Sequence, residues 1–186
     1  AAFNVTTDTN TYNTAVGQNA GGSVTTGVQN TLIGGLAGDA LTDADFNVAL
    51  GYLALTADTL GSRSIGIGYG ALQSQNFTTA TDSHNVAVGF KAGEAVTTGD
   101  SNTLIGGLAG DALNTGNSNV VLGYNALSSD TKGDRSVAIG MATLTTQNFT
   151  TSTDTYNTAV GFAAGNAITT STHNTLIGGS AGDALT

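Results

Sequence analysis

The 186-residue sequence contains no cysteine, proline or tryptophan, and only 9% of its residues are charged. Without cysteine the chain has neither a disulfide framework nor thiolate chemistry. Four basic residues stand against thirteen acidic ones, which gives a net charge of −9. This balance excludes a basic face for nucleic-acid phosphates or for an anionic membrane surface. The sequence also lacks an apolar run long enough for a membrane-spanning helix, so we expect no membrane insertion.

What the sequence has in excess is glycine, with 27 residues, and its apolar fraction is 39%. That apolar content excludes a charged disordered chain, and glycine follows no three-residue period as it does in collagen. The many Thr, Val, Ile, Ala, Asn and Ser residues predict short strands joined by tight turns.

A five-residue pattern that starts with Asn or Ser and ends with Gly recurs ten times from residue 13 onward. Successive copies are 17 residues apart, except that every fourth spacing is 21, so four copies form a 72-residue superrepeat. Nested self-similarity of this kind indicates a solenoid, in which each unit packs only on its neighbours. We therefore predict an all-β fold, a parallel β-solenoid (β-roll or β-helix) of ten 17–21-residue coils. It would occupy residues 13–186 as a single domain, with superrepeats 13–84 and 85–156 and a partial one at 157–186.

Residues 1–12 are expected to be the tail of a preceding coil or loop, because 6–12 resemble the end of a four-residue insertion. The chain has no initiator Met and no signal peptide, and its last copy stops after the first strand and turn. We expect it to be a piece, or a processed product, of something longer.

Positions are numbered from the first residue of each copy. Position five is Gly in all ten copies, which predicts a corner with positive φ or a close approach of two backbones. Asn at position one predicts a ladder of amides that bond to one another or cap the turn. Position thirteen, always Thr or Asn, predicts a second ladder. The glycines are Gly17, Gly34, Gly51, Gly68, Gly89, Gly106, Gly123, Gly140, Gly161 and Gly178, and the asparagines are Asn13, Asn30, Asn47, Asn85, Asn102, Asn119, Asn157 and Asn174.

Positions two and four share one face of the first strand, and position three on the other face is also mostly apolar. We expect both faces to be buried, the second one by partner chains around a common axis. A second strand is expected at positions eleven to thirteen. A bulky apolar residue occupies either position nine or position twelve of each coil, so we predict that Leu55 and Val24 point into the same interior column.

The four-residue insertions are expected to form loops on one side of the rod. Their aromatic and acidic residues are candidate receptor contacts, although the aromatic rings could instead cover their own coil. Arg63 and Arg135 are expected to form local ion pairs with Asp58 and Asp130 of the same coils. The candidate receptor-contact residues are Phe77, Asp82, Phe149 and Asp154.

No metal or cofactor site is expected. His84 and His173 lack a second ligand at metal-binding spacing, although a trimer could bring three copies of each together. An aspartate follows the Ala-Gly pair in the second coil of each superrepeat. We interpret these aspartates as turn residues, with a calcium site as the alternative. These are Asp39, Asp111 and Asp183. We expect no enzyme, because the sequence contains no catalytic set whose spacing suggests a shared cleft.

Copies such as Ser136-Val137-Ala138-Ile139-Gly140 and Asn157-Thr158-Ala159-Val160-Gly161 resemble the N-S-V-A-I-G repeat of the YadA-like head of trimeric autotransporter adhesins. Similar N-T-x-x-G-x-x-A-G repeats occur in bacteriophage tail-fibre proteins. The resemblance covers nearly the whole chain, but the coils here are longer than the family's usual ones. It implies a left-handed roll, a homotrimer, and an extracellular location on a virion tail fibre or a bacterial cell surface.

The functional prediction is therefore a non-enzymatic fibre segment that attaches to a host or surface, with a glycan or protein receptor as a possible partner. An ice-binding threonine-rich solenoid is the first alternative, because threonine ladders can order water. A glycan-cleaving fibre is the second, and it would need paired carboxylates in a groove.

Overall fold

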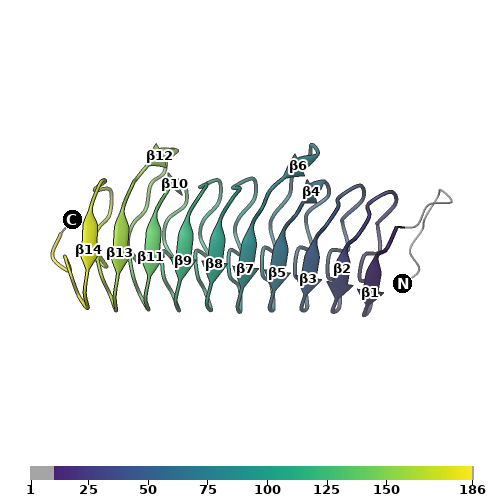
Figure 1. Ribbon diagram of the computed structural model, residues 1–186, viewed down its shortest axis with the longest axis horizontal. Helices are drawn as coiled ribbons and strands as arrows, with labels where there is room; N and C mark the ends of the chain where they lie inside the picture. The colour runs from purple at the N-terminus through teal and green to yellow at the C-terminus, as the bar shows by residue number, and fades with distance from the viewer. Residues whose placement is uncertain (1–10, 186) are drawn as a thin grey trace.

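The computed structural model describes residues 11–185, which fold into a straight rod of stacked coils (Figure 1). Each coil contributes one three-residue strand, and the ten strands form one parallel sheet in chain order. The predicted all-β, parallel β-solenoid of ten coils is thus confirmed. The strands are β1 (Thr14–Val16), β2 (Thr31–Ile33), β3 (Val48–Leu50), β5 (Ile65–Ile67), β7 (Val86–Val88), β8 (Thr103–Ile105), β9 (Val120–Leu122), β11 (Val137–Ile139), β13 (Thr158–Val160) and β14 (Thr175–Ile177).

Two short parallel ladders lie beside the main sheet, one in each complete superrepeat. β4 (Gly61–Ser62) pairs with β6 (Thr81–Asp82), and β10 (Gly133–Asp134) pairs with β12 (Thr153–Asp154). They hold the four-residue insertions, which rise above one edge of the rod in Figure 1. The predicted tail in residues 1–12 falls almost entirely outside the described residues.

Strand register places equivalent positions of neighbouring coils side by side. Position three points inward, as the full burial of Leu32 and Leu104 shows. Positions eight, nine and twelve also point inward and complete one continuous core. A Cβ on Gly93, at position nine, would meet Leu104 at 2.7 Å, Leu72 at 3.1 Å and Val96 at 3.3 Å. Side chains from positions three, nine and twelve therefore share one interior column, as predicted for Leu55 and Val24.

The second strand predicted at positions eleven to thirteen is wrong: the described residues contain no strand there. The chain instead alternates its backbone hand through the preceding turn, with positive φ at Gly17, Asn19 and Gly21. The turn continues to position twelve, where the Val24 N–H donates to the Gly21 carbonyl at 3.1 Å. The coils still bond to one another across this side, since the Ser23 N–H donates to the Asp39 carbonyl at 3.0 Å.

The position-one asparagines form a buried ladder that joins coils in two ways. The Asn47 N–H donates to Asn30 Oδ1 at 2.9 Å, while Asn30 Nδ2 donates to the Ala44 carbonyl at 2.8 Å. The Asn30 side chain thereby accepts a hydrogen bond from the next coil and donates one to the end of its own coil. Both bonds satisfy backbone groups that burial would otherwise leave unpaired. The same pair of bonds recurs at Asn102 with Asn119 and Gly116.

A buried polar cluster replaces this ladder where each insertion begins. Gln147 Nε2 donates to Asp130 Oδ2 at 2.6 Å and to Ser136 Oγ at 2.9 Å, and its Oε1 accepts from Asn157 Nδ2 at 2.8 Å. Asp130 Oδ1 accepts from the Phe149 N–H at 3.0 Å. The cluster is completely buried and tethers the inserted loop to the coil below it. Asp58, Ser64, Gln75 and Asn85 repeat the arrangement in the first superrepeat.

Candidate interaction surface

The outer surface of the ten-stranded sheet is uncharged and open in the single chain: position four is Val, Ile or Leu in every coil, and position two is Thr in five of them and Val or Ile in the rest. Positions two and four point outward here, opposite to the buried position three. Val120 and Leu122 on β9 are 41% and 45% exposed, against complete burial of Val121 between them. The inner face is thus buried as predicted, and the burial of the outer face by partner chains stays a prediction. We call the outer surface the sheet face; its position-four row is Val16, Ile33, Leu50, Ile67, Val88, Ile105, Leu122, Ile139, Val160 and Ile177.

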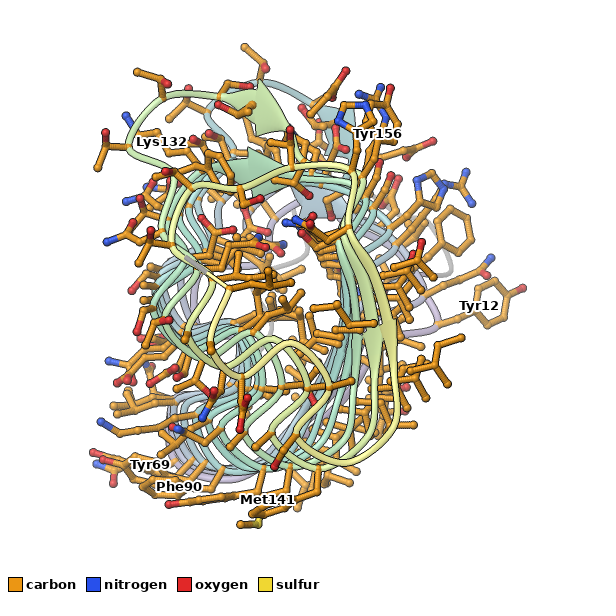
Figure 2. All side chains as sticks on the ribbon, turned by 90° about the vertical axis from the view of Figure 1, so that its left-hand side faces the viewer. Tyr12, Tyr69, Phe90, Lys132, Met141 and Tyr156 are labelled. Carbon is orange, nitrogen blue, oxygen red and sulfur yellow. The ribbon has the colours of Figure 1, made fainter. Side chains whose placement is uncertain are left out.

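A second exposed apolar surface, which the sequence reasoning missed, lies at position six, directly after the corner glycine. Figure 2 shows Tyr69, Phe90 and Met141 gathered at the lower left of the coil, while the sheet lies along the right-hand side. We call this surface the aromatic row; it consists of Tyr52, Tyr69, Phe90, Tyr124, Met141 and Phe162, each 44–58% exposed. The signal available in the sequence was the recurrence of a large residue after the corner Gly in two runs of three consecutive coils, each run bounded by glycines.

The rings of the aromatic row stack on one another along the rod. Ring centroids are 5.8 Å apart between Tyr52 and Tyr69 and 5.4 Å apart between Tyr69 and Phe90, whose planes differ by only 17°. Glycine interrupts the row in the second coil of each superrepeat, where a Cβ on Gly35 would lie 3.1 Å from the Tyr52 ring. Tyr52, Tyr69 and Phe90 therefore cover each other's ring faces within this run of three coils.

The inserted loops do not present aromatic side chains for contact. Phe77 and Phe149 are each only 6% exposed, because their rings cover the coil that carries the buried polar cluster. Of the four candidate receptor-contact residues, the two phenylalanines are thus buried structural residues rather than surface contacts. Asp82 and Asp154 do reach solvent at the loop edges.

The predicted ion pairs of Arg63 with Asp58 and of Arg135 with Asp130 are wrong. Arg63 Nε lies 2.9 Å from Asp82 Oδ2, and Arg135 pairs likewise with Asp154. The reason is that Asp58 and Asp130 lie inside the rod, whereas the insertion folds back over the coil that bears the arginine. Both pairs are about half-exposed, so each contributes little to stability.

The residues that precede position one form a mixed edge beside the sheet face. The Arg63 guanidinium lies 4.8 Å from the Phe46 ring centroid, and the Tyr156 and His173 rings lie 5.1 Å apart. His84 is exposed on the same edge. No group of three or more potential metal ligands occurs within residues 11–185.

One acidic position is electrostatically strained in this chain. Burial raises the pKa of the Asp111 carboxyl, and the nearby charge of Glu94 adds to the rise, while backbone N–H groups and Lys91 oppose it. Asp111 Oδ1 has no hydrogen-bond partner among the described residues. Asp39, the equivalent residue one superrepeat earlier, accepts a hydrogen bond from the Thr56 hydroxyl.

We expect Asp111→Asn to raise the melting temperature at pH 7. A raised pKa in the folded state means that the wild type loses stability as pH rises through the ordinary and then the raised value. The gain should therefore vanish at about pH 3, where the carboxyl is protonated in both states. Asp39→Asn is the matched control and should not be stabilising at either pH. A gain for Asp111→Asn that is unchanged at pH 3 would contradict the electrostatic origin.

The position-thirteen ladder bonds its hydroxyls to the neighbouring coil. The Thr42 hydroxyl donates to the Thr59 carbonyl at 3.1 Å, and the Thr97 hydroxyl donates to Asn114 Oδ1 at 2.7 Å. These hydroxyls join neighbouring coils, which is a structural task. The described part of the chain also shows no pocket in which ligands could be enclosed.

Residues 11–185 include no helix that could cross a membrane. When the chain is compared with models of protein families, with curated proteins and with solved structures, none of the three comparisons returns a match.

Proposed function

We propose that this chain is a segment of a non-enzymatic structural fibre, a rigid β-solenoid shaft that assembles with two further copies of itself. The shaft would belong to a virion tail fibre or a bacterial surface adhesin and would serve attachment to a host or another surface. The resemblance of its repeats to YadA-like heads and to tail-fibre repeats supports this assignment. The receptor would be a surface glycan or protein reached by the completed fibre.

The observation that carries the proposal is the sheet face. It runs the full length of the rod without one charged residue, although the chain has a net charge of −9. Ten coils at about 4.8 Å each give a strip roughly 48 Å long. At a width of about 15 Å, two or three side-chain rows, such a strip offers roughly 700 Å², close to the area that each partner contributes to a stable interface. Exposed apolar surface of this extent is typical of an interaction site.

The test is the molar mass of the chain in solution. The single chain has a mass of 18.3 kDa, so we expect light scattering during size-exclusion chromatography to give three times that value. Leu122→Asp places a charge at the centre of the sheet face on an already exposed side chain, and it should reduce the mass toward that of one chain. Thr98→Asp adds the same charge at an exposed site away from the sheet face and should leave the trimer intact. A wild-type chain that is monomeric at micromolar concentration would overturn the proposal.

Two other functions have simple discriminating assays. An ice-binding solenoid would show thermal hysteresis, but its regular threonine hydroxyls are used within the rod. A glycan-cleaving fibre would reduce the viscosity of a polysaccharide solution, but the loop carboxylates Asp82 and Asp154 are each paired with arginine. We expect neither activity.

A further inference from the structure

We propose that the aromatic row is the surface that receives the sheet face of a neighbouring copy, so that copies pack side by side, parallel and coil for coil. This inference rests on the proposed function, because it requires that copies of the chain assemble. It specifies which two surfaces meet, in which orientation and in which register.

The first step is a symmetry argument. In a ring of three identical chains, each interface joins two different surfaces, one from each neighbour. Three sheet faces turned toward a common axis could meet row against row, with position two of one copy on position four of the next. That arrangement would leave the aromatic row uncovered, whereas side-by-side packing of the sheet face on the aromatic row covers both exposed surfaces.

The aromatic row can supply the second surface of such an interface. It follows the corner glycine in each coil, and none of its own residues is charged; the one ion pair beside it joins Lys91, whose Nζ lies 5.8 Å from the Phe90 ring centroid, to Glu94. The mixed edge on the other side of the sheet face is a poorer fit, because Arg63 and Arg135 with their paired aspartates interrupt it. Since the whole chain is strongly acidic, copies can approach most closely where neither surface is charged.

The two surfaces also share one periodicity. Rows on both surfaces repeat at the coil spacing of about 4.8 Å, so ring edges of one copy can lie between aliphatic tips of the position-four row of the next when both chains run in the same direction. The row is interrupted at Gly35, Gly107 and Gly179, once in four coils. The position-four row also repeats every four coils, as Val, Ile, Leu and Ile, so a shift along the rod by one or three coils would place these gaps against Leu or Val instead of Ile.

The stacking of the rings favours a protein neighbour over a sugar. A pyranose ring binds against an exposed aromatic face, whereas Tyr69 and Phe90 cover each other with centroids 5.4 Å apart. Ring edges and a Met thioether instead make a flexible apolar surface suited to aliphatic side chains.

Because the chain has no cysteine, engineered thiols report the contact without background. Val120→Cys marks the sheet face and Tyr124→Cys marks the aromatic row of the same coil. The two variants are co-expressed with distinguishable tags and treated with a short bismaleimide. We expect cross-links between the two variants at least tenfold above those within either variant alone. Tyr52→Cys, four coils or roughly 19 Å away, is the register control and should not cross-link with Val120→Cys.

Molar mass measured on the same samples separates the possible failures. A monomeric chain would end the proposed function and this inference with it. A trimer in which Val120→Cys cross-links to itself, or to Tyr52→Cys instead of Tyr124→Cys, would overturn the inference alone. The same holds if Tyr69→Ser with Tyr124→Ser leaves the trimer as stable to dilution as the wild type, because the row would then serve another ligand such as a glycan.

Discussion

Replacing Gly106 by alanine should prevent the rod from folding, or destabilise it by about 4 kcal/mol or more. Gly106 has a φ of 132°, which side chains rarely tolerate. A Cβ built on it would also lie 2.5 Å from the carbonyl oxygen of Gly123 in the next coil, and this neighbour is backbone. Relief would require the two coils to separate, which would break the strand pairing of β8 with β9.

Gly178→Ala is the matched control for this prediction. Gly178 has a similar φ of 126°, but an added Cβ would meet nothing within 4 Å. Its cost should therefore be confined to backbone strain, about 1–3 kcal/mol. Far-ultraviolet circular dichroism and thermal melting of both variants measure the difference. Equal losses for the two substitutions would show that coil-to-coil contact is not what requires glycine at position five.

Gln147→Leu should cost about 3–5 kcal/mol, because it leaves a buried carboxylate without one of its partners. The substitution removes the donor to Asp130 Oδ2, the donor to Ser136 Oγ and the acceptor for Asn157 Nδ2. None of these atoms can turn to water, since all four residues are buried. The added apolar side chain does not compensate, since Leu127 and Leu144 already fill the adjoining column.

Hydrogen exchange is the best measurement for this variant, because solenoid coils lose stability locally rather than all at once. Protection should fall first in β10 and β12 and in the loop between Phe149 and Thr155. Gln73→Leu, at a partly exposed glutamine outside the polar cluster, should change stability by less than about 0.5 kcal/mol. A Gln147→Leu variant as protected as the wild type would mean that the cluster is dispensable.

Much of the fold could be predicted from spacing alone. Ten copies in fixed register imply ten coils. Glycine at position five of every copy, as at Gly17, implies a corner where a side chain cannot fit. Each coil has its bulky apolar residue at either position nine or position twelve, as Leu72 and Val96 illustrate. This alternation predicted the shared interior column, because it is expected when both positions fill the same space.

Other features depend on contacts between coils that spacing does not encode. Small and apolar residues at positions eleven to thirteen suit a strand and a turn equally, and the alternating φ of the preceding residues decided between them. Arg63 pairs with Asp82 rather than Asp58 because the insertion folds back over the coil that carries the arginine. The same folded-back conformation buries Phe77. The aromatic row was missed because an aromatic residue such as Tyr69 or Phe90 is usually interpreted as a core residue. Only the structure shows that position six lies on the outside of the coil.

The hydrogen bonds between coils run parallel to the rod, as the pairing of β1 with β2 and of every later neighbour shows. A pull on the two ends of one chain therefore loads these bonds in series, and the weakest junction opens while the others stay closed. Each released coil of 17 residues could extend to roughly 60 Å from its stacked rise of about 4.8 Å. We therefore expect the rod to lengthen stepwise under tension, and in the trimer proposed above lateral contact between copies would set the force at which it begins to yield.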